Sequence, residues 1–484
     1  MRSESHEHQL HVIFFPYMAQ GHLIPNIHMA KLFASKGTKV TILTTSHFTP
    51  FLAKSIENNT SQINILNIKF PATEVGLPEE VDSSPAARTP EMFEKFVQAC
   101  GKLAPQLDQI LEQHLPDCLV CDALFPWATD VAEKFGIPTL LFNGTCNFAM
   151  CVVASLFLHE PYKKVSSDSE HFLIPDLPDQ IELTASKLPY FMKHHDESTE
   201  LGKLYIAIRE VERRNYGIIV NSFYELEPAY ADLYKKVSGI KTWQIGPLFL
   251  SDYNMSNSNN QLECMKWLDT KKPSSVIYVS FGSVANFNDE QLMEIATGLE
   301  ASGQQFIWVV KKEKVEGVEE EWLPEGFEER MKERGLIVRG WAPQVPILEH
   351  EAVGGFVTHC GWNSILESVC AGVPMVTWPV AAEQFFNEKL VSQVLNIGVE
   401  VGARKWVRMV GDFVKRERIR NAVSRIMEGE EAEEMRRRVK SLAEMGRSAI
   451  KEAGSSMLDF NALFHDLRSA RIARDSTHRQ ENVH

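Results

Sequence analysis

The sequence lacks the features that mark several large classes of protein. Acidic side chains outnumber basic ones among its 484 residues, and the formal net charge is -14. A broad nucleic-acid surface needs a concentrated excess of Lys and Arg, so this balance argues against one. No apolar run reaches the length of a membrane span. Residues 1–8 lack the basic and apolar segments of a secretory signal, so we expect a cytoplasmic protein.

Cysteine is also sparse, with eight residues, most of them in apolar stretches. Cys118 and Cys121 form a C-x-x-C pair, but the residues between them are apolar and belong to a predicted buried strand. This setting favours core packing of reduced thiols over a redox or zinc site. H-x-x-x-H and Asp-x-Asp pairs are absent as well. We therefore expect no metal and no other cofactor.

Length and hydrophobic patterning predict an α/β protein of two domains. A chain of 484 residues is too long for one core, and its hydrophobic content of 44% is ordinary for a globular protein. Short apolar runs alternate with longer periodic segments in both halves, which is typical of Rossmann-like, doubly wound units. We expect two such domains to face each other across a cleft. The predicted strands are residues 11–16, 39–44, 63–70, 117–121, 138–142 and 217–221, followed by 275–280, 305–310, 336–339, 355–358 and 374–377.

The domain boundary is predicted from a polar stretch without periodicity at residues 251–260. We assign residues 1–245 to an N-terminal domain, 246–260 to an interdomain linker and 261–467 to a C-terminal domain. The final helix of the second domain is expected to pack back on the first. Residues 468–484 are expected to form a flexible tail.

Polar residues after strand ends are the first candidates for a site, because ligands of open α/β sheets bind at the carboxyl ends of the strands. The dinucleotide fingerprint G-x-G-x-x-G and the P-loop are both absent, so the ligand must be bound by another arrangement of residues. His22 follows the first strand, and we expect it on a loop before a helix that starts at Pro25. Its imidazole has a pKa suited to taking a proton from a hydroxyl. A histidine that merely caps the helix fits this position equally well.

Asp122 directly follows the predicted strand 117–121 and offers a carboxylate to orient such a histidine. From position alone, a helix N-cap for the segment that starts at Phe125 is the favoured alternative.

The second half contains the stronger signal, at residues 359–364, which read HCGWNS. They follow one strand and open a helix, so backbone N–H groups point outward there. With the side chains of Asn363 and Ser364 they make an anion site of diphosphate size. Trp341 follows another strand, and it is either an ordinary core aromatic or a platform on which a nucleobase stacks.

Three further polar residues lie near this segment in the sequence. Glu367 is about one helical turn past Ser364, which places it within reach of a ribose. Glu383 and Gln384 follow the strand at 374–377 and its terminal proline. Adjacent carboxylate and amide groups are what vicinal sugar hydroxyls require.

Residues 341–384 resemble the signature box of plant secondary-product UDP-glycosyltransferases, a family 1 group with the GT-B fold; they read WAPQVPILEHEAVGGFVTHCGWNSILESVCAGVPMVTWPVAAEQ. The resemblance extends over nearly the whole chain through FFPYMAQGHLIPNIHMAKLF, FPWATD, NSFYELE, YVSFGS and KWVR. These segments look like the branch that contains flavonoid and triterpenoid glucosyltransferases. The resemblance implies an inverting, metal-free O-glucosyltransferase that uses UDP-glucose and a lipophilic plant metabolite.

The resemblance also implies a role for each candidate residue. His22 would be the general base and Asp122 its supporting carboxylate. Trp341 would stack on uracil, and Ala342 and Gln344 would bond to the nucleoside. Glu367 would bind the ribose, and the diphosphate would be bound by His359, Asn363, Ser364 and Ser283. The glucose hydroxyls would be bound by Trp362, Glu383 and Gln384.

Alternatives remain for the sugar donor and for the class of protein. Many relatives carry Asp at the position of Glu383, so a carboxylate is retained in this sequence. The glutamine at position 384 resembles that of family members that use glucose. A member that uses UDP-glucuronate, UDP-galactose or UDP-xylose, or a non-catalytic sensor on the same fold, is the alternative. A nucleotide-sugar epimerase or dehydrogenase is disfavoured, because no tyrosine is followed by lysine in a Tyr-x-x-x-Lys pair.

The acceptor pocket is expected in the N-terminal domain, and its shape is not predicted. Its walls would come from loops around Met18, residues 76–88, Leu124, residues 143–150 and residues 188–201. Their apolar and aromatic content suits a flat flavonoid or a triterpenoid. We expect a monomer whose partners are the UDP-sugar and the small acceptor.

Overall fold

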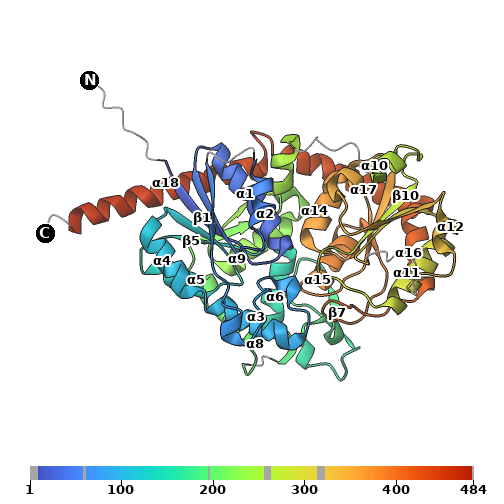
Figure 1. Ribbon diagram of the computed structural model, residues 1–484, viewed down its shortest axis with the longest axis horizontal. Coiled ribbons are helices and arrows are strands. Elements are labelled where there is room, and N and C mark those ends of the chain that lie inside the picture. Colours follow the sequence, from blue (N-terminus) through green and yellow to red (C-terminus); the bar gives the residue numbers. More distant parts are fainter. Residues whose placement is uncertain (1–8, 58–61, 195–196, 256–262, 313–321, 482–484) are drawn as a thin grey trace.

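The computed structural model describes residues 9–57, 62–194, 197–255, 263–312 and 322–481. These residues form two α/β halves that lie side by side, the N-terminal one blue to green and the C-terminal one yellow to orange in Figure 1. This arrangement confirms the predicted doubly wound fold. Residues 1–8, 256–260 and 482–484, on which part of the signal, linker and tail predictions rest, lie outside the described residues.

The N-terminal half is built on a seven-stranded sheet in which the strand order is β3-β2-β1-β4-β5-β8-β9 and all pairs are parallel. Helices cover both faces, which explains why its central strands are apolar throughout. The strands are β1 (His11–Phe15), β2 (Lys39–Thr44), β3 (Ile63–Asn67), β4 (Cys118–Asp122), β5 (Thr139–Phe142), β8 (Gly217–Val220) and β9 (Lys241–Gln244).

The C-terminal half repeats this design with a six-stranded parallel sheet in the order β12-β11-β10-β13-β14-β15. Its core contains the fully buried side chains of Tyr278, Trp308 and Trp378. Burying a large aromatic side chain contributes about 1.5–3 kcal/mol. The strands are β10 (Val276–Ser280), β11 (Gln305–Val310), β12 (Gly335–Arg339), β13 (Val353–Thr358), β14 (Met375–Thr377) and β15 (Gly398–Glu400).

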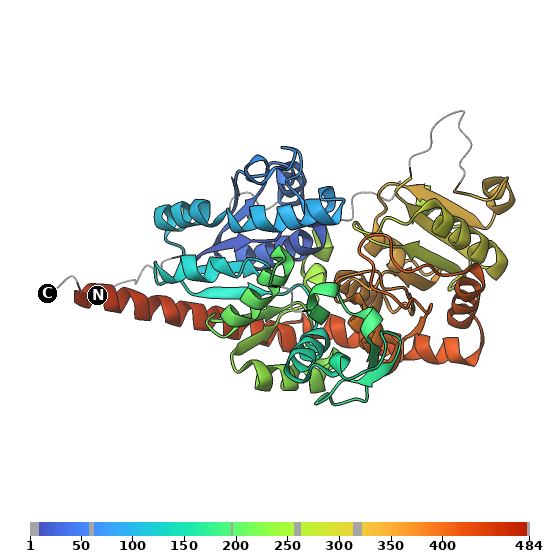
Figure 2. The ribbon, with the colours of Figure 1, turned by 90° about the horizontal axis from the view of Figure 1, so that it is seen from below.

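Helices connect successive strands in both halves (Figures 1 and 2). In the N-terminal half they are α1 (Gln20–Ser35), α2 (Thr49–Ser55), α3 (Pro90–Gly101), α4 (Ala104–His114), α5 (Trp127–Glu133), α6 (Asn147–His159), α7 (Tyr190–His194), α8 (Glu200–Glu212) and α9 (Pro228–Ser238). In the C-terminal half they are α10 (Glu263–Leu268), α11 (Asp289–Ser302), α12 (Phe327–Met331), α13 (Gln344–Glu349), α14 (Trp362–Ala371), α15 (Gln384–Lys389), α16 (Arg416–Met427), α17 (Gly429–Ala449) and α18 (Ser455–Glu481). Short 3-10 turns occur at η2 (Thr73–Val75), η3 (Ser84–Ala86), η4 (Pro161–Lys163), η5 (Ala185–Lys187) and η6 (Tyr224–Leu226), and a π turn at η8 (Leu390–Val394).

The eleven predicted strands are all present, but four observed strands were not predicted. The edge strands β9 and β15 read KTWQ and GVE, which are too short or too polar for a clear pattern. A small antiparallel hairpin of β6 (His171–Leu173) and β7 (Glu182–Thr184) also stands apart from the main sheets. Three-residue strands leave no measurable periodicity in a sequence.

The strand order of each sheet reverses direction at one place, and these places position the site. In the N-terminal sheet the chain moves outward from β1 on one side and from β4 on the other. In the C-terminal sheet the corresponding neighbours are β10 and β13. The loops after such a pair diverge, which opens a crevice at the carboxyl ends of the strands.

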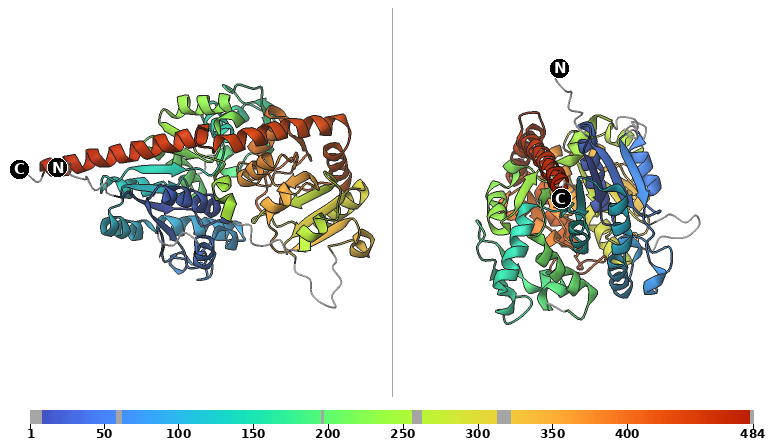
Figure 3. Two further views of the ribbon diagram at one scale, coloured as in Figure 1. Left: turned by 90° about the horizontal axis from the view of Figure 1, so that it is seen from above. Right: turned by 90° about the vertical axis from the view of Figure 1, so that its left-hand side faces the viewer.

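Two boundary predictions need correction. The first part of the expected linker forms an ordered 3-10 helix, η7 (Leu248–Met255), which packs against α1. The expected flexible tail is also wrong up to Glu481, because α18 continues through it as one long helix (Figure 3).

Helix α18 packs back on the N-terminal half, as predicted. Phe460 is buried beside Phe33 of α1, with ring centroids 5.1 Å apart. Further along, Arg471 and Arg474 lie 3.1 and 2.9 Å from the buried carboxylate of Asp117. These ion pairs explain why the helix does not fray at residue 468.

All eight cysteines are free and buried. Cys118 and Cys121 lie within β4, where burial raises the pKa of both thiols. Their expected role in core packing is thereby confirmed. Among the described residues, no helix combines the length and apolarity needed to cross a membrane.

Candidate active site

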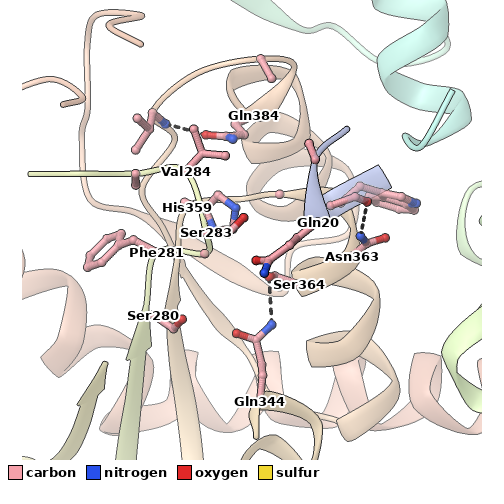
Figure 4. Close-up of a pocket in the computed structure, with 18 of the residues that line it drawn as sticks. Gln20, Ser280, Phe281, Ser283, Val284, Gln344, His359, Asn363, Ser364 and Gln384 are labelled. Carbon is pink, nitrogen blue, oxygen red and sulfur yellow. Dashed lines mark hydrogen bonds between the residues drawn. The ribbon is translucent and has the colours of Figure 1, made fainter. Parts of the chain in front are cut away.

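A cavity of about 1470 Å³ lies between the two halves and is lined by residues from both. Its walls include the loops after β1, β10 and β13, so it occupies the crevice at which both sheets reverse direction. The polar residues of the C-terminal half converge on it in Figure 4.

His22 and Asp122 form the N-terminal contribution to this cavity. The His22 Nδ1 atom lies 2.7 Å from the Asp122 Oδ2 atom, although the residues are 100 positions apart. The parallel pairing of β1 with β4 brings them together, because Asp122 is the last residue of β4 and His22 lies in the first turn of α1, the helix that follows β1. Asp122 is buried at 1% exposure, whereas the His22 side chain is 29% exposed. The carboxylate of the pair is therefore enclosed by protein, whereas the imidazole is accessible from the cavity.

The position of His22 differs from the expected loop. Helix α1 begins at Gln20, so His22 lies in its first turn, and Pro25 lies inside the helix instead of at its start. The N-cap residue is Ala19. His22 does not cap the helix, which removes the alternative left open by its position.

Asp122 does not cap a helix N-terminus in the manner expected either. Helix α5 begins at Trp127 with Pro126 at the N-cap. The second oxygen of Asp122 accepts a hydrogen bond of 3.1 Å from the backbone N–H of Leu124. This bond fixes the carboxylate at the end of β4, while Oδ2 bonds to His22 and, at 3.5 Å, accepts from the backbone N–H of Tyr17.

The surroundings of His22 favour its protonated form. Burial acts to lower the pKa of the imidazole, but the Asp122 carboxylate, by its charge and its hydrogen bond, and the more distant Glu383 raise it. The net result is a pKa above the ordinary value of histidine. A carboxylate on Nδ1 also holds the proton of the neutral ring there, so Nε2 is the nitrogen that accepts a proton.

One end of the cavity is formed by residues after β12 and by α14; the family resemblance implies a nucleotide there, so we call it the nucleotide end. Trp341 lines it with 77% of its surface exposed, which excludes the core alternative and leaves a flat aromatic face open to a ligand. Gln344 donates hydrogen bonds of 3.0 and 2.6 Å to Ser364 Oγ and Glu367 Oε2. Burial raises the pKa of Glu367 to about 7, against the opposing effect of the Gln344 bond.

His359 lies behind this end, after β13, and is buried between two glycines. A Cβ atom on Gly282 or Gly361 would come within 2.6 or 2.4 Å of its ring, so neither position admits a side chain. Burial and the charge of Lys311 lower the pKa of His359 to about 4, so the ring is neutral. Its Nδ1 is buried and has no hydrogen-bond partner among the described residues. The residue lines the cavity, although this nitrogen is itself covered by protein.

Trp362 and Asn363 open helix α14 and line the cavity, and the first N–H groups of a helix have no partner within it. The Asn363 amide donates to the Gly21 carbonyl of the other half at 2.8 Å. The Trp362 indole N–H donates to the Asn221 carbonyl at 2.7 Å. The one polar group of the Trp362 side chain is therefore already bonded to protein, and the expected contact of Trp362 with glucose stays a prediction.

Glu383 and Gln384 form the rim at the start of α15. The Gln384 Oε1 atom accepts from the backbone N–H groups of Val380 and Ala381, both at 2.9 Å, which leaves its Nε2 donor facing the cavity. Burial raises the pKa of Glu383, and Asn387 donates to its Oε1 at 3.1 Å. A donor and an acceptor are thus fixed side by side.

Several cavity residues were missed from the sequence. Lys311 follows β11 and donates to the Ser283 and Ala285 carbonyls at 2.5 and 2.8 Å, which shapes the loop that carries Ser283. The strand-end rule that identified the others applies to Lys311 as well. Gln20 lines the cavity from the first turn of α1 (Figure 4).

The other end of the cavity is apolar and lies mainly in the N-terminal half. Expected loops contribute Tyr17, Ala19, Ser84, Leu124, Asn143, Gly144, Phe191 and Leu201; the Met18 side chain itself is buried and is not among the lining residues. Phe93, Val97 and Leu204 on α3 and α8 were not predicted, nor were Trp406 and Arg408 from the C-terminal half. The Arg408 guanidinium lies 3.6 Å from the centre of the Phe93 ring, so a cation closes this end.

These features define a class: a two-domain enzyme in which one half holds a nucleotide-linked group and the other presents a carboxylate-supported base. Two family models match the chain, the glycosyltransferase N-terminal domain over residues 8–250 and "UDP-glucoronosyl and UDP-glucosyl transferase" over residues 249–438. The chain belongs to this family and is a UDP-glycosyltransferase with the GT-B fold, as the resemblance implied.

Individual relatives match almost from end to end. A UDP-glucose flavonoid 3-O-glucosyltransferase of Fragaria ananassa is 54% identical, with 95% of this chain and 96% of the relative covered. A scopoletin glucosyltransferase of Nicotiana tabacum is 51% identical over 95% and 98% of the two chains. The crystal structure of Glycyrrhiza uralensis UGT73P12 with glycyrrhetinic acid 3-O-monoglucuronide has a TM-score of 0.89 at 39% identity, covering 98% and 99%.

Proposed function

We propose that this protein transfers glucose from UDP-glucose to a hydroxyl of a flat, lipophilic plant metabolite, with inversion at the sugar carbon. The observation that carries the proposal is the His22–Asp122 pair of 2.7 Å, which opens on the same cavity as the nucleotide end. A base and a donor site on opposite walls are what a single displacement requires.

In the proposed reaction the acceptor oxygen forms a bond to the anomeric carbon while the bond from that carbon to UDP breaks. The acceptor proton moves to His22 Nε2, and Asp122 stabilises the imidazolium. The diphosphate leaves as an anion, and its charge is matched by the N–H groups of α14, the side chains of Ser283 and Ser364, and the neutral His359. We expect no metal to take part, so chelation with EDTA should leave turnover unchanged.

The donor assignment rests on both ends of the nucleotide sugar. Trp341 offers a face for uracil, with Ala342 and Gln344 beside it, and Glu367 lies one turn into α14 for the ribose. Gln384 and Glu383 offer the donor and the acceptor for vicinal glucose hydroxyls. The similar proteins of Fragaria and Nicotiana are named as glucosyltransferases, and a Medicago truncatula UGT71G1 with TM-score 0.79 and 29% identity was solved with UDP-glucose.

The acceptor class follows from the apolar end of the cavity. Phe93, Phe191 and several aliphatic side chains surround the space next to His22, which suits a flavonoid or coumarin ring system, and a triterpenoid as the second choice. The names of the relatives favour flavonoid and phenolic acceptors. We propose that the protein works in the cytoplasm as a monomer.

The decisive experiment compares His22→Ala with the wild type. We expect turnover to fall roughly 10²–10⁴-fold, the usual contribution of a general base, while UDP still binds with unchanged affinity in calorimetry. Product analysis with flavonols, coumarins and triterpenoid alcohols, and with UDP-glucuronate, UDP-galactose and UDP-xylose as donors, assigns both substrates. Unchanged turnover in His22→Ala would refute the mechanism, and absence of any product would favour a sensor.

A further inference from the structure

The first turn of α1, which carries His22, is bonded to the opposite half of the molecule. Pro25 lies inside this helix and has no backbone N–H. In an α-helix that N–H would bond to the carbonyl four residues earlier, which is Gly21. The Gly21 carbonyl therefore has no helical donor at this position, and the Asn363 Nδ2 atom of α14 donates to it at 2.8 Å.

The orientation of the Asn363 amide is set by a second asparagine. Asn221, which directly follows β8, places its Nδ2 atom 3.5 Å from the Asn363 Oδ1 atom. With its oxygen toward Asn221, the Asn363 amide directs its nitrogen at Gly21. One of the two N–H bonds of that nitrogen is used by Gly21, and the other is left for a ligand.

Asn221 is itself held firmly. Its Oδ1 accepts from the Leu248 N–H at 3.0 Å, and its carbonyl accepts from the Trp362 indole at 2.7 Å. A Cβ atom on the neighbouring Gly246 would come within 2.5 Å of the Asn221 side chain. The 4% exposure of Asn221 agrees with this packing. A rigid asparagine thus directs an amide of the donor-binding half onto the helix of the base.

We propose that Pro25 and Asn221 are positioning residues for the reaction: Pro25 frees the Gly21 carbonyl, Asn221 orients Asn363 toward it, and the resulting bond sets His22 against the sugar carbon. This rests on the proposed function, in which His22 is the base. His22 follows Gly21 directly, so a shift of that carbonyl moves the imidazole too. A misplacement of about 1 Å costs roughly 10²-fold in rate when it affects reacting groups.

The first test is Pro25→Ala, which supplies the missing N–H and lets the helix compete with Asn363 for the Gly21 carbonyl. The variant keeps every side chain of the site and improves the helix, so it should fold. We expect kcat to fall roughly 10-fold. The affinity for UDP should not change, because the residues that bind the sugar donor remain. The pH at which kcat falls on the acidic side of its pH profile should not change either, because the His22–Asp122 bond remains. Pro105→Ala, in the first turn of α4 on the same half, is the control and should behave as wild type.

The second test is Asn221→Asp, which still accepts from Leu248 but donates nothing to Asn363. The carboxylate favours the opposite orientation of the Asn363 amide, whose oxygen then faces the Gly21 carbonyl and repels it. We expect a similar loss of kcat. Asn64→Asp, on the exposed surface of β3, adds the same charge without effect on the bond.

The double variant decides whether both residues act through one bond. We expect it to lose no more than the stronger single variant, because a bond can be broken only once. Fully additive losses, or wild-type kcat in both single variants, would overturn the proposal. If His22→Ala is inactive while these variants are fully active, only the positioning role fails; if His22→Ala is active, the proposed base fails as well.

Discussion

The two halves share one architecture but bring opposite chemistry to the cleft. In the N-terminal half, the crevice beside β1 and β4 holds one hydrogen-bonded pair, His22 and Asp122, next to apolar walls. In the C-terminal half, the crevice beside β10 and β13 holds a dense set of donors and acceptors around α14. The comparison shows that the fold supplies the place, whereas the loops decide whether it receives a polar nucleotide or an apolar acceptor.

The largest effect is expected from Asp122→Asn, which tests the sparse N-terminal crevice. An amide can donate to Nδ1 and leave Nε2 protonated, so the base is lost; we expect turnover to fall roughly 10²–10⁴-fold. Asp122 raises the pKa of His22, and the base must be neutral to act, so wild-type activity falls as the pH drops through this raised pKa. Loss of Asp122 should move the acidic limb of residual activity to lower pH. A limb that stays in place would show that another group controls it.

A smaller effect is expected from Trp341→Ala in the crowded C-terminal crevice. Stacking on an aromatic side chain contributes about 1–3 kcal/mol per base, which corresponds to a loss of UDP affinity of about 5- to 150-fold. The kcat at saturating donor should change little, because the indole contacts only the nucleotide. Calorimetry with UDP measures the first quantity and initial rates the second. Unchanged UDP affinity would contradict the role of Trp341.

Lys311→Met tests the C-terminal crevice through the pH dependence of UDP binding. Burial lowers the pKa of Lys311 to about 8, so its ammonium is charged below that pH and neutral above it. If this charge assists diphosphate binding, wild-type affinity for UDP should weaken as the pH rises through about 8. The variant should bind UDP more weakly, by up to about 5-fold at pH 7, and its affinity should depend less on pH above that value. Equal profiles for both proteins would leave Lys311 with a structural role alone.

The smallest effect on activity is expected from a truncation that tests how far the stability of the first half depends on the last helix. Truncation after Leu467 removes Arg471 and Arg474, which bond to the buried Asp117. Hydrogen bonds to charged groups contribute about 1.5–3 kcal/mol, so we expect a loss of this size in the free energy of unfolding measured with urea. Truncation after Glu481 is the control. Equal stability of both truncations would mean that the ion pairs contribute nothing.

Much of the fold was predictable because its signals are local. Strands such as β2 and β11 were predicted residue for residue, since their apolar runs record burial on both faces. The edge strands β9 and β15 were not, because they are too short or too polar to show a pattern. The continuation of α18 was not, because it is held by ion pairs with the distant Asp117. Local sequence does not record such partners.

The candidate site was predicted from strand ends and from the family resemblance, and the roles of its residues stay predictions until they are measured. The structure brings all of the proposed residues to one cavity or its immediate wall. It also places residues there to which the sequence analysis gave no role, above all Arg408 against Phe93 and Asn221 against Asn363.

The sequence by itself determined the two alternating α/β series, the strand ends at which polar residues gather, and the family. Only the tertiary structure decided that the Asp122 carboxylate lies 2.7 Å from His22 and that Asn363 lies 2.8 Å from the carbonyl freed by Pro25. The reason is physical: apolar periodicity records burial, residue by residue, whereas a distance across 100 or 342 positions depends on how sheets pair and halves pack.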